Sequence, residues 1–198
     1  MSRIDSTPPT LVAAGSEPRR MLFLLTMALP MAMVAAHFGM GRLAGKSMIL
    51  VAGSLPLTIA ATAAGVAAIM GVAWRVLAHA MDRQALRLEQ GALEVRSGFH
   101  QTRVLLADMR LAQARVVDLD EHIKMLPRFK RNAFSVPGGF RSGWYQLRNK
   151  RKAFVATAEG RHVLWLPCDG DHDLLLEVRE PRAVLERLRT LAGATHRA

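Results

Sequence analysis

Two long stretches without a charged side chain follow each other near the N-terminus, at residues 21–41 and 47–74. A helix needs about 20 apolar residues to cross the hydrocarbon core of a bilayer, and both stretches reach that length. Only residues 42–46 separate them, which is enough for a tight turn and too short for a domain. The sequence therefore predicts a transmembrane helical hairpin over residues 21–81, with spans at about 21–41 and 47–75.

The rest of the chain divides into a leader and a domain. Residues 1–20 precede the hairpin. They include several Ser, Thr, Pro and Gly residues and show no hydrophobic periodicity, which predicts a disordered leader. Residues 82–198 follow it with many charges and alternating apolar and polar positions. This segment has the size of one small globular domain.

A cleaved signal peptide is an alternative interpretation of the first stretch. Arg19 and Arg20 would form its basic flank, and Val34-Ala35-Ala36 would be a cleavage site of small residues. A second spanning stretch follows at once, which a secreted product would not need. We therefore expect the hairpin to be retained.

The distribution of basic residues predicts the orientation of the hairpin. They flank both of its outer ends: Arg3, Arg19 and Arg20 before the first span, and Arg75, Arg83 and Arg87 after the second. The short loop carries only Arg42 and Lys46. By the positive-inside rule, both termini and the domain lie in the cytoplasm.

Within residues 82–198, period-two alternation predicts about seven strands followed by one helix. The segments are 85–89, 92–97, 99–106, 112–119, 143–148, 153–158, 162–168 and 174–178. Turns at 90–91, 149–151 and 159–161 predict a hairpin meander, whereas the basic segment 124–132 with its proline is expected to be irregular. From Pro181, apolar residues at helical spacing predict a closing helix over a small bent barrel.

Two segments carry a resemblance to a known family. They are "LEVRSGFHQTRVLLADMRLAQARVVDL" and "RNAFSVPGGFRSGWYQLRNKRKAFVATAEGRHVLWLPCDGDHDLLLEVREPRAVLERL". The second is similar to the family's glycine–tyrosine–arginine–glycine–tryptophan block, with Phe140 in the tyrosine position before Arg141, Gly143 and Trp144. The chain thus resembles the bacterial pleckstrin-homology-like (PH-like) domains that follow a transmembrane hairpin.

The resemblance implies an α+β protein in the bacterial inner (plasma) membrane: a transmembrane hairpin followed by a PH-like barrel of about seven strands, capped by a C-terminal helix. It implies no enzyme activity, no catalytic residues and no cofactor. The sequence adds no metal site, because its histidines lack zinc-like pairs at helical spacing. Its acidic stretch after Cys168 lacks the glycine that a calcium loop requires.

The candidate binding site is a long segment of one charge sign. From His122 to Ala158 there is no acidic residue. The basic residues of this segment are Lys124, Arg128, Lys130, Arg131, Arg141, Arg148, Lys150, Arg151 and Lys152. Three interpretations of these residues are open. They form a solvated surface without a specific partner, they contact anionic lipid headgroups with an attraction of about 1 kcal/mol per side chain, or they bind an acidic protein. Nucleic acid is not expected, since the interleaved aromatic residues fit a barrel core.

The hairpin itself suggests two further possibilities. Small residues at four-residue spacing in the second span, such as Ala60, Ala64 and Ala68, allow close packing of the hairpin on itself or, as the alternative, helix contacts in a homo-oligomer. The alternative function is a subunit of a membrane-embedded enzyme or transport complex. Such a subunit would need ionisable side chains within the membrane, and His37 is the one such side chain within the spans. The main expectation is a non-enzymatic membrane protein that presents a binding or scaffolding domain.

Overall fold

The computed structural model describes residues 10–45, 51–158, 160–170 and 172–195. They form two compact units. The helical unit comprises residues 19–79, and the globular unit combines the chain before residue 19 with the chain from Ala80 onward. Residues 1–9 of the predicted leader and residues 46–50, which include Lys46 and the start of the second predicted span, lie outside the described residues.

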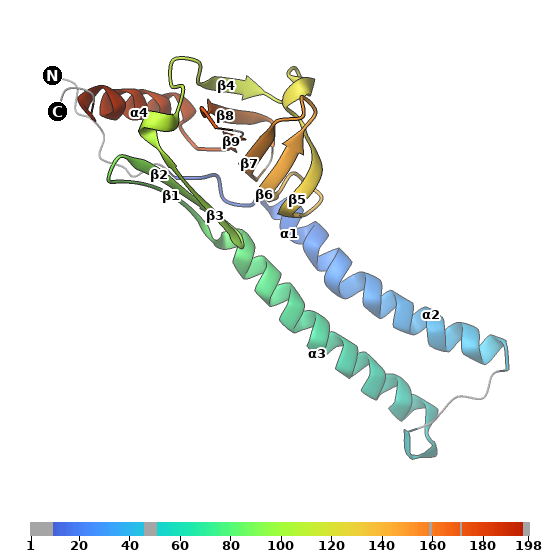
Figure 1. The fold of residues 1–198 in the computed structure, drawn as a ribbon. Helices are drawn as coiled ribbons and strands as arrows, with labels where there is room; N and C mark the ends of the chain where they lie inside the picture. The colour runs from blue at the N-terminus through green and yellow to red at the C-terminus, as the bar shows by residue number, and fades with distance from the viewer. Residues whose placement is uncertain (1–9, 46–50, 159, 171, 196–198) are drawn as a thin grey trace. The chain divides into compact units, whose positions relative to one another are not determined.

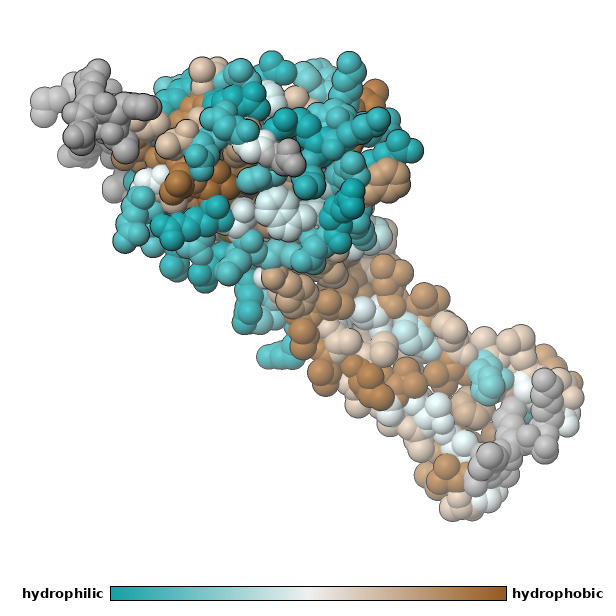
Figure 2. Space-filling model, in the orientation of Figure 1, coloured by the Kyte–Doolittle hydropathy of each residue, from teal (hydrophilic) through white to brown (hydrophobic). Residues whose placement is uncertain are grey.

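Two long apolar helices dominate the N-terminal part of the chain (Figure 1). The first runs over Ser16–Leu43 as α1 (Ser16–Phe23), the π-helical turn η1 (Leu24–Ala28) and α2 (Leu29–Leu43), and the second is α3 (Leu55–Asp82). Each has 28 residues, so each is about 42 Å long. Only 6% of the most apolar window of each is buried, and the exposed hydrophobic surface is plain in Figure 2. Both helices are long and apolar enough to cross a bilayer.

Proline explains where these helices deviate from regular geometry. Pro30 has no N–H to donate to the carbonyl of Thr26, and its ring crowds that carbonyl. The preceding turn widens, so that the N–H of Leu29 bonds to the carbonyl of Leu24 instead. Pro56 lies in the first turn of α3, where a missing N–H costs nothing. The second helix therefore starts at Leu55, later than predicted, and continues through Trp74 to Asp82.

Nine strands form two open sheets in the described part of the globular unit. They are β1 (Gln84–Glu89), β2 (Ala92–Ser97), β3 (His100–Leu105), β4 (Arg115–Asp118), β5 (Pro127–Ser135), β6 (Arg141–Leu147), β7 (Lys152–Thr157), β8 (His162–Pro167) and β9 (His172–Leu176). The first sheet has the order β1-β2-β3, and the second has the order β4-β8-β9-β7-β6-β5. The helix α4 (Pro181–Thr195) follows, as predicted.

The prediction of an α+β fold with a C-terminal helix is confirmed, but three details of the β-structure were wrong. Nine strands replace about seven, and among the described residues the sheets are open rather than closed into one barrel. The predicted hairpin meander is wrong because β9 lies between β7 and β8 in the sheet, parallel to β7 and antiparallel to β8. The segment 124–132 is not irregular: from Pro127 it forms the edge strand β5, where a proline at the first position is tolerated.

The six-stranded sheet is buried on both faces. One face packs with the three-stranded sheet and α4 around Leu93, Phe154 and Leu188, and we call this the first core. The other face carries the second core, including Tyr145, Leu147 and Val155, with Met125 and Leu126 from the β4–β5 connection packed against it. Burial on both faces explains the nearly continuous apolar sequence of β7.

The leader is also part of this unit. Leu11 is 5% exposed and belongs to the first core, and it forms a β-bridge with Val178. The helix α1 begins at Ser16. The prediction of a disordered leader is thus wrong for residues 10–20, because the apolar side chain of Leu11, five residues before the helix, is buried against the domain.

Candidate functional site

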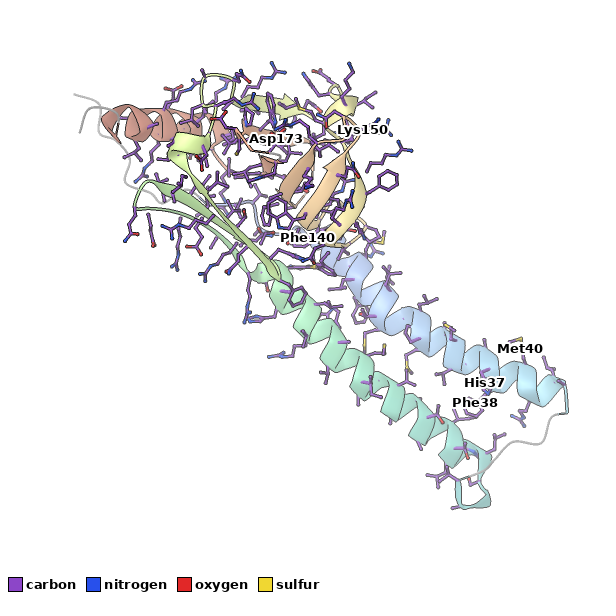
Figure 3. The ribbon with its side chains drawn as sticks, viewed as in Figure 1. His37, Phe38, Met40, Phe140, Lys150 and Asp173 are labelled. Carbon is purple, nitrogen blue, oxygen red and sulfur yellow. The ribbon has the colours of Figure 1, made fainter. Side chains whose placement is uncertain are left out.

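Three of the predicted basic residues are brought together at one end of the six-stranded sheet. The N–H of Asn149 donates to the carbonyl of Lys124 at 3.0 Å, and the N–H of Arg148 donates to the carbonyl of Leu126 at 3.1 Å. These bonds fasten the β6–β7 turn to the 3₁₀ turn η4 (Ile123–Met125). We call Lys124, Arg148 and Lys150 the basic end; all three are exposed, and Figure 3 labels Lys150.

The turn itself is built by local backbone chemistry. Lys150 has φ +69°, and its N–H donates to the carbonyl of Leu147 at 3.0 Å. The Asn149 side chain accepts a bond from the N–H of Arg151 at 3.0 Å, as asparagine does in tight turns. Hydrogen bonds therefore fix the backbone of the basic end, whereas its three charged side chains are exposed.

Arg151 has a different role from its neighbours. Its Nη2 lies 2.8 Å from Oδ1 of Asp173, whose side chain is 1% exposed. The other carboxylate oxygen of Asp173 accepts a bond from Nε1 of Trp165 at 3.1 Å. Because a buried carboxylate needs its charge balanced, Arg151 belongs to the structure of the sheet. Its guanidinium is thus already engaged by Asp173, and Arg151 is not counted in the basic end.

Three further basic residues lie on the edge strand β5 and are exposed. The Arg128 guanidinium stacks 4.9 Å from the centre of the Phe129 ring, and Phe129 is itself 55% exposed. Arg131 donates to the side chain of Gln146 at 3.1 Å. Lys130 pairs with Tyr145 through the backbone. The pairing register of β5 with β6 shifts between Pro127 and Phe129 and again between Lys130 and Asn132. These cations line the edge next to the basic end.

The last two members of the predicted set are separated along the sheet. Lys152 starts β7 opposite Gln146 and is exposed near the basic end. Arg141 starts β6, six residues before Leu147, so about 20 Å of strand separates it from the turn. Arg141 lies near Tyr145, where burial raises the pKa of the phenol against the opposing effects of Ser135 and of Arg141 itself.

A polar cluster at the Arg141 end was not predicted. Ser142 is fully buried, and its hydroxyl donates to the carbonyl of Ser97. His100 lies with Nδ1 3.4 Å from that hydroxyl and with Nε2 3.1 Å from Oδ1 of Asn132. A serine beside a histidine is the arrangement of a nucleophile and its base. Here the serine proton is committed to a carbonyl and the oxygen is inaccessible, so the cluster ties β3 to β5 and β6.

His37 and Cys168 lie outside the basic segment and differ in exposure. His37 is exposed on α2 with its ring edge-on to Phe38 at 5.6 Å, and no described side chain forms a hydrogen bond or ion pair with it (Figure 3). Cys168 is 1% exposed, and burial, followed by the charge of Asp173, raises the pKa of its thiol to about 11. No group of three potential metal ligands occurs among the residues that the structure describes.

Comparison with protein-family models, with curated proteins and with solved structures gave no match for this chain.

Proposed function

We propose that the chain is a non-enzymatic membrane protein that presents a binding domain of the bacterial PH-like type at the cytoplasmic face of the inner membrane. Two observations support the anchor: both long helices expose almost all of their apolar surface, and basic residues flank their outer ends. In water such a surface would be a strong aggregation liability, whereas a bilayer covers it.

The observation that carries the binding role is the basic end. Lys124, Arg148 and Lys150 are held within one pair of hydrogen-bonded turns, without an acidic residue between positions 122 and 158. Exposed apolar side chains accompany them: Ile123 is 51% exposed and Phe129 is 55% exposed. Cations beside exposed apolar groups fit a partner that offers both carboxylates and apolar contact.

Within the globular unit, the basic end is separated along β6 from the residues that lead into the unit, and for this reason we propose an acidic protein rather than the leaflet. Arg83, which follows α3 and precedes β1, is bonded to the β2–β3 turn, where the N–H of Gly98 donates to its carbonyl at 3.0 Å. Ser97 in the same segment accepts the bond from Ser142. The basic end follows Leu147, five residues further along β6, or about 17 Å. The chain thus enters the unit at one end of β6, and the charges gather at the other.

Binding can be tested with the full chain in nanodiscs of neutral lipid. We expect a poly-glutamate peptide to bind, with an affinity that falls steeply as salt is raised, because exposed charges are screened beyond about 8 Å at physiological ionic strength. Replacing Lys124, Arg148 and Lys150 together by Gln should abolish this binding. Vesicles containing phosphatidylglycerol serve as the second probe, and binding to them in preference to the peptide would assign the basic end to the leaflet.

The matched control removes the same charge elsewhere. Arg87, Arg103 and Arg182 are exposed residues of β1, β3 and α4, and all three lie outside the basic segment. Their replacement by Gln should leave peptide binding within about twofold of the parent. Equal losses in the two triple variants would show that net charge alone, rather than the basic end, attracts the peptide, and would refute the proposal.

A further inference from the structure

We infer that residues 10–18 are a built-in strap of the globular unit, and that this strap forces an even number of membrane crossings between residues 18 and 84. That the long helices cross a membrane rests on the proposed function, but the docking of the strap on the globular unit does not. The strap joins the start of the first long helix, and the residues just before it, to a domain that follows the second long helix.

Backbone pairing fixes the first part of the strap. The N–H of Val12 donates to the carbonyl of Glu177 at 2.9 Å, and the N–H of Arg179 donates to the carbonyl of Thr10 at 3.3 Å. Leu11 and Val178 face each other between these bonds. The strap thus adds a short antiparallel partner to the chain that continues from β9.

Side-chain burial fixes the strap further along. Leu11, Ala14 and Pro18 are all buried, and Leu11 fills part of the first core. At Gly138, whose φ is +97°, an added Cβ would lie 3.0 Å from the nitrogen of Pro18. The strap therefore passes so close to the β5–β6 turn that only glycine fits beneath it.

The strap also forms one wall of a polar cavity of about 590 Å³, opposite Arg161, His162 and Glu177. The carboxylate of Glu177 accepts bonds from the N–H groups of Ala158 and Gly160, at 2.8 and 2.9 Å. The strand to which the strap pairs is therefore itself anchored to the sheet, and this supports a fixed strap.

Two consequences follow for the membrane. A segment that pairs with Val178 must lie on the same side of the bilayer as Val178, so either both long helices cross or neither does. Cleavage at Val34-Ala35-Ala36 would remove Leu11 and uncover the first core. The strap thus favours a retained leader over a cleaved signal peptide, on grounds independent of the second spanning stretch.

A disulfide between the strap and the domain tests the inference in intact membranes. Leu11 and Val178 are an antiparallel pair without direct hydrogen bonds, for which Cα atoms lie about 4.5 Å apart, within the range that a disulfide requires. The experiment uses full-length L11C/V178C with Cys168, the single native cysteine, replaced by Ala. A protease site inserted between α2 and α3 separates the chain into two fragments.

After oxidation, membrane solubilisation and proteolysis, we expect the two fragments to stay together on a non-reducing gel and to separate on a reducing gel. T10C/R179C, in which both native residues are exposed, should give the same result if loss of Leu11 impairs folding. L11C/K150C should give no cross-link. Lys150 lies two residues before Lys152, which pairs with His172, and His172 is six residues, or about 20 Å, before Val178, the partner of Leu11.

Three results would overturn the inference. Fragments that separate in both neighbouring cysteine pairs would show that the strap is not docked. A dimer-sized band before proteolysis would show pairing between two copies rather than within one chain. Reporters fused before residue 10 and after residue 198 that lie on opposite sides would exclude an even number of crossings. Loss of peptide binding in the basic-end variant affects none of these results, so the two proposals fail separately.

Discussion

Both ends of β6 carry polar side chains, but the two ends use them in opposite ways. At the Ser142 end, the polar groups of Ser142, His100 and Asn132 contact one another or the backbone, and Ser142 is fully buried. At the Leu147 end, Lys124, Arg148 and Lys150 are exposed on a backbone that hydrogen bonds hold in place. The first end stabilises the fold, whereas the second offers its charges to a partner. Substitutions at the two ends should therefore have opposite effects on stability and on binding.

The largest loss of stability is expected from Gly143→Ala at the Ser142 end. Gly143 has φ +109°, and an added Cβ would lie 2.5 Å from the carbonyl oxygen of Asn132 and 2.9 Å from Nδ1 of His100. Backbone strain of about 1–3 kcal/mol and an overpacking cost of about 1–3 kcal/mol sum to roughly 2–6 kcal/mol. Denaturant unfolding of the full chain in detergent micelles, followed by tryptophan fluorescence, measures this loss.

Gly91→Ala is the control for Gly143→Ala. Gly91 also has a positive φ, +72°, but nothing lies within 4 Å of an added Cβ. Its replacement should cost only about 1–2 kcal/mol, the strain of a left-handed residue. Equal losses at the two glycines would show that the close packing at the Ser142 end does not contribute.

Asp173→Ala is expected to have the next largest effect. It removes the carboxylate that balances Arg151 and leaves the partly buried Nε1 donor of Trp165 without its acceptor. Because the Arg151 side chain is 38% exposed and can turn to water, the loss should be about 2–3 kcal/mol rather than the 3–5 kcal/mol of a fully buried pair. Asp169→Ala, at an exposed carboxylate, should cost less than about 1 kcal/mol in the same unfolding assay.

Ser142→Ala should destabilise by about 1–2 kcal/mol, since it leaves the buried carbonyl of Ser97 without its donor. The exposed hydroxyl of Thr190 also donates to a backbone carbonyl, so Thr190→Ala is the control and should change stability by less than about 0.5 kcal/mol. A Ser142→Ala variant as stable as the parent would mean that the cluster does not join the two sheets.

Local signals in the sequence were sufficient for the helices and most strands. The uncharged stretches predicted the two long helices, and the Gln90-Gly91 pair predicted the β1–β2 turn, where both residues have positive φ. The strand β5 was missed because a proline and several cations are unfavourable in a central strand. They are tolerated, and protect against unwanted pairing, at an edge.

Pairing between distant segments could not be predicted in the same way. Nothing local in β8 or β9 shows that β9 inserts beside β7, and the pairing of Leu11 with Val178 joins residues at opposite ends of the chain. The candidate site has the same limit. The charge pattern identified Arg151 and Lys150 as equivalent, but only the fold brings Asp173, 22 residues away, to one of them.

The smallest effect on stability is expected at the basic end, where the effect on binding is largest. Lys150→Gln should change the free energy of unfolding by less than about 0.5 kcal/mol, because the side chain is exposed and the turn depends on backbone bonds. Arg151→Gln, one residue later, should cost about 2 kcal/mol, because Asp173 keeps its charge and loses the guanidinium. Peptide binding should show the reverse order, with a greater loss for Lys150→Gln than for Arg151→Gln. If Arg151→Gln weakened binding more while the domain stayed folded, the ligand would contact the Arg151–Asp173 pair, and the boundary drawn here between structural and binding charges would have to move.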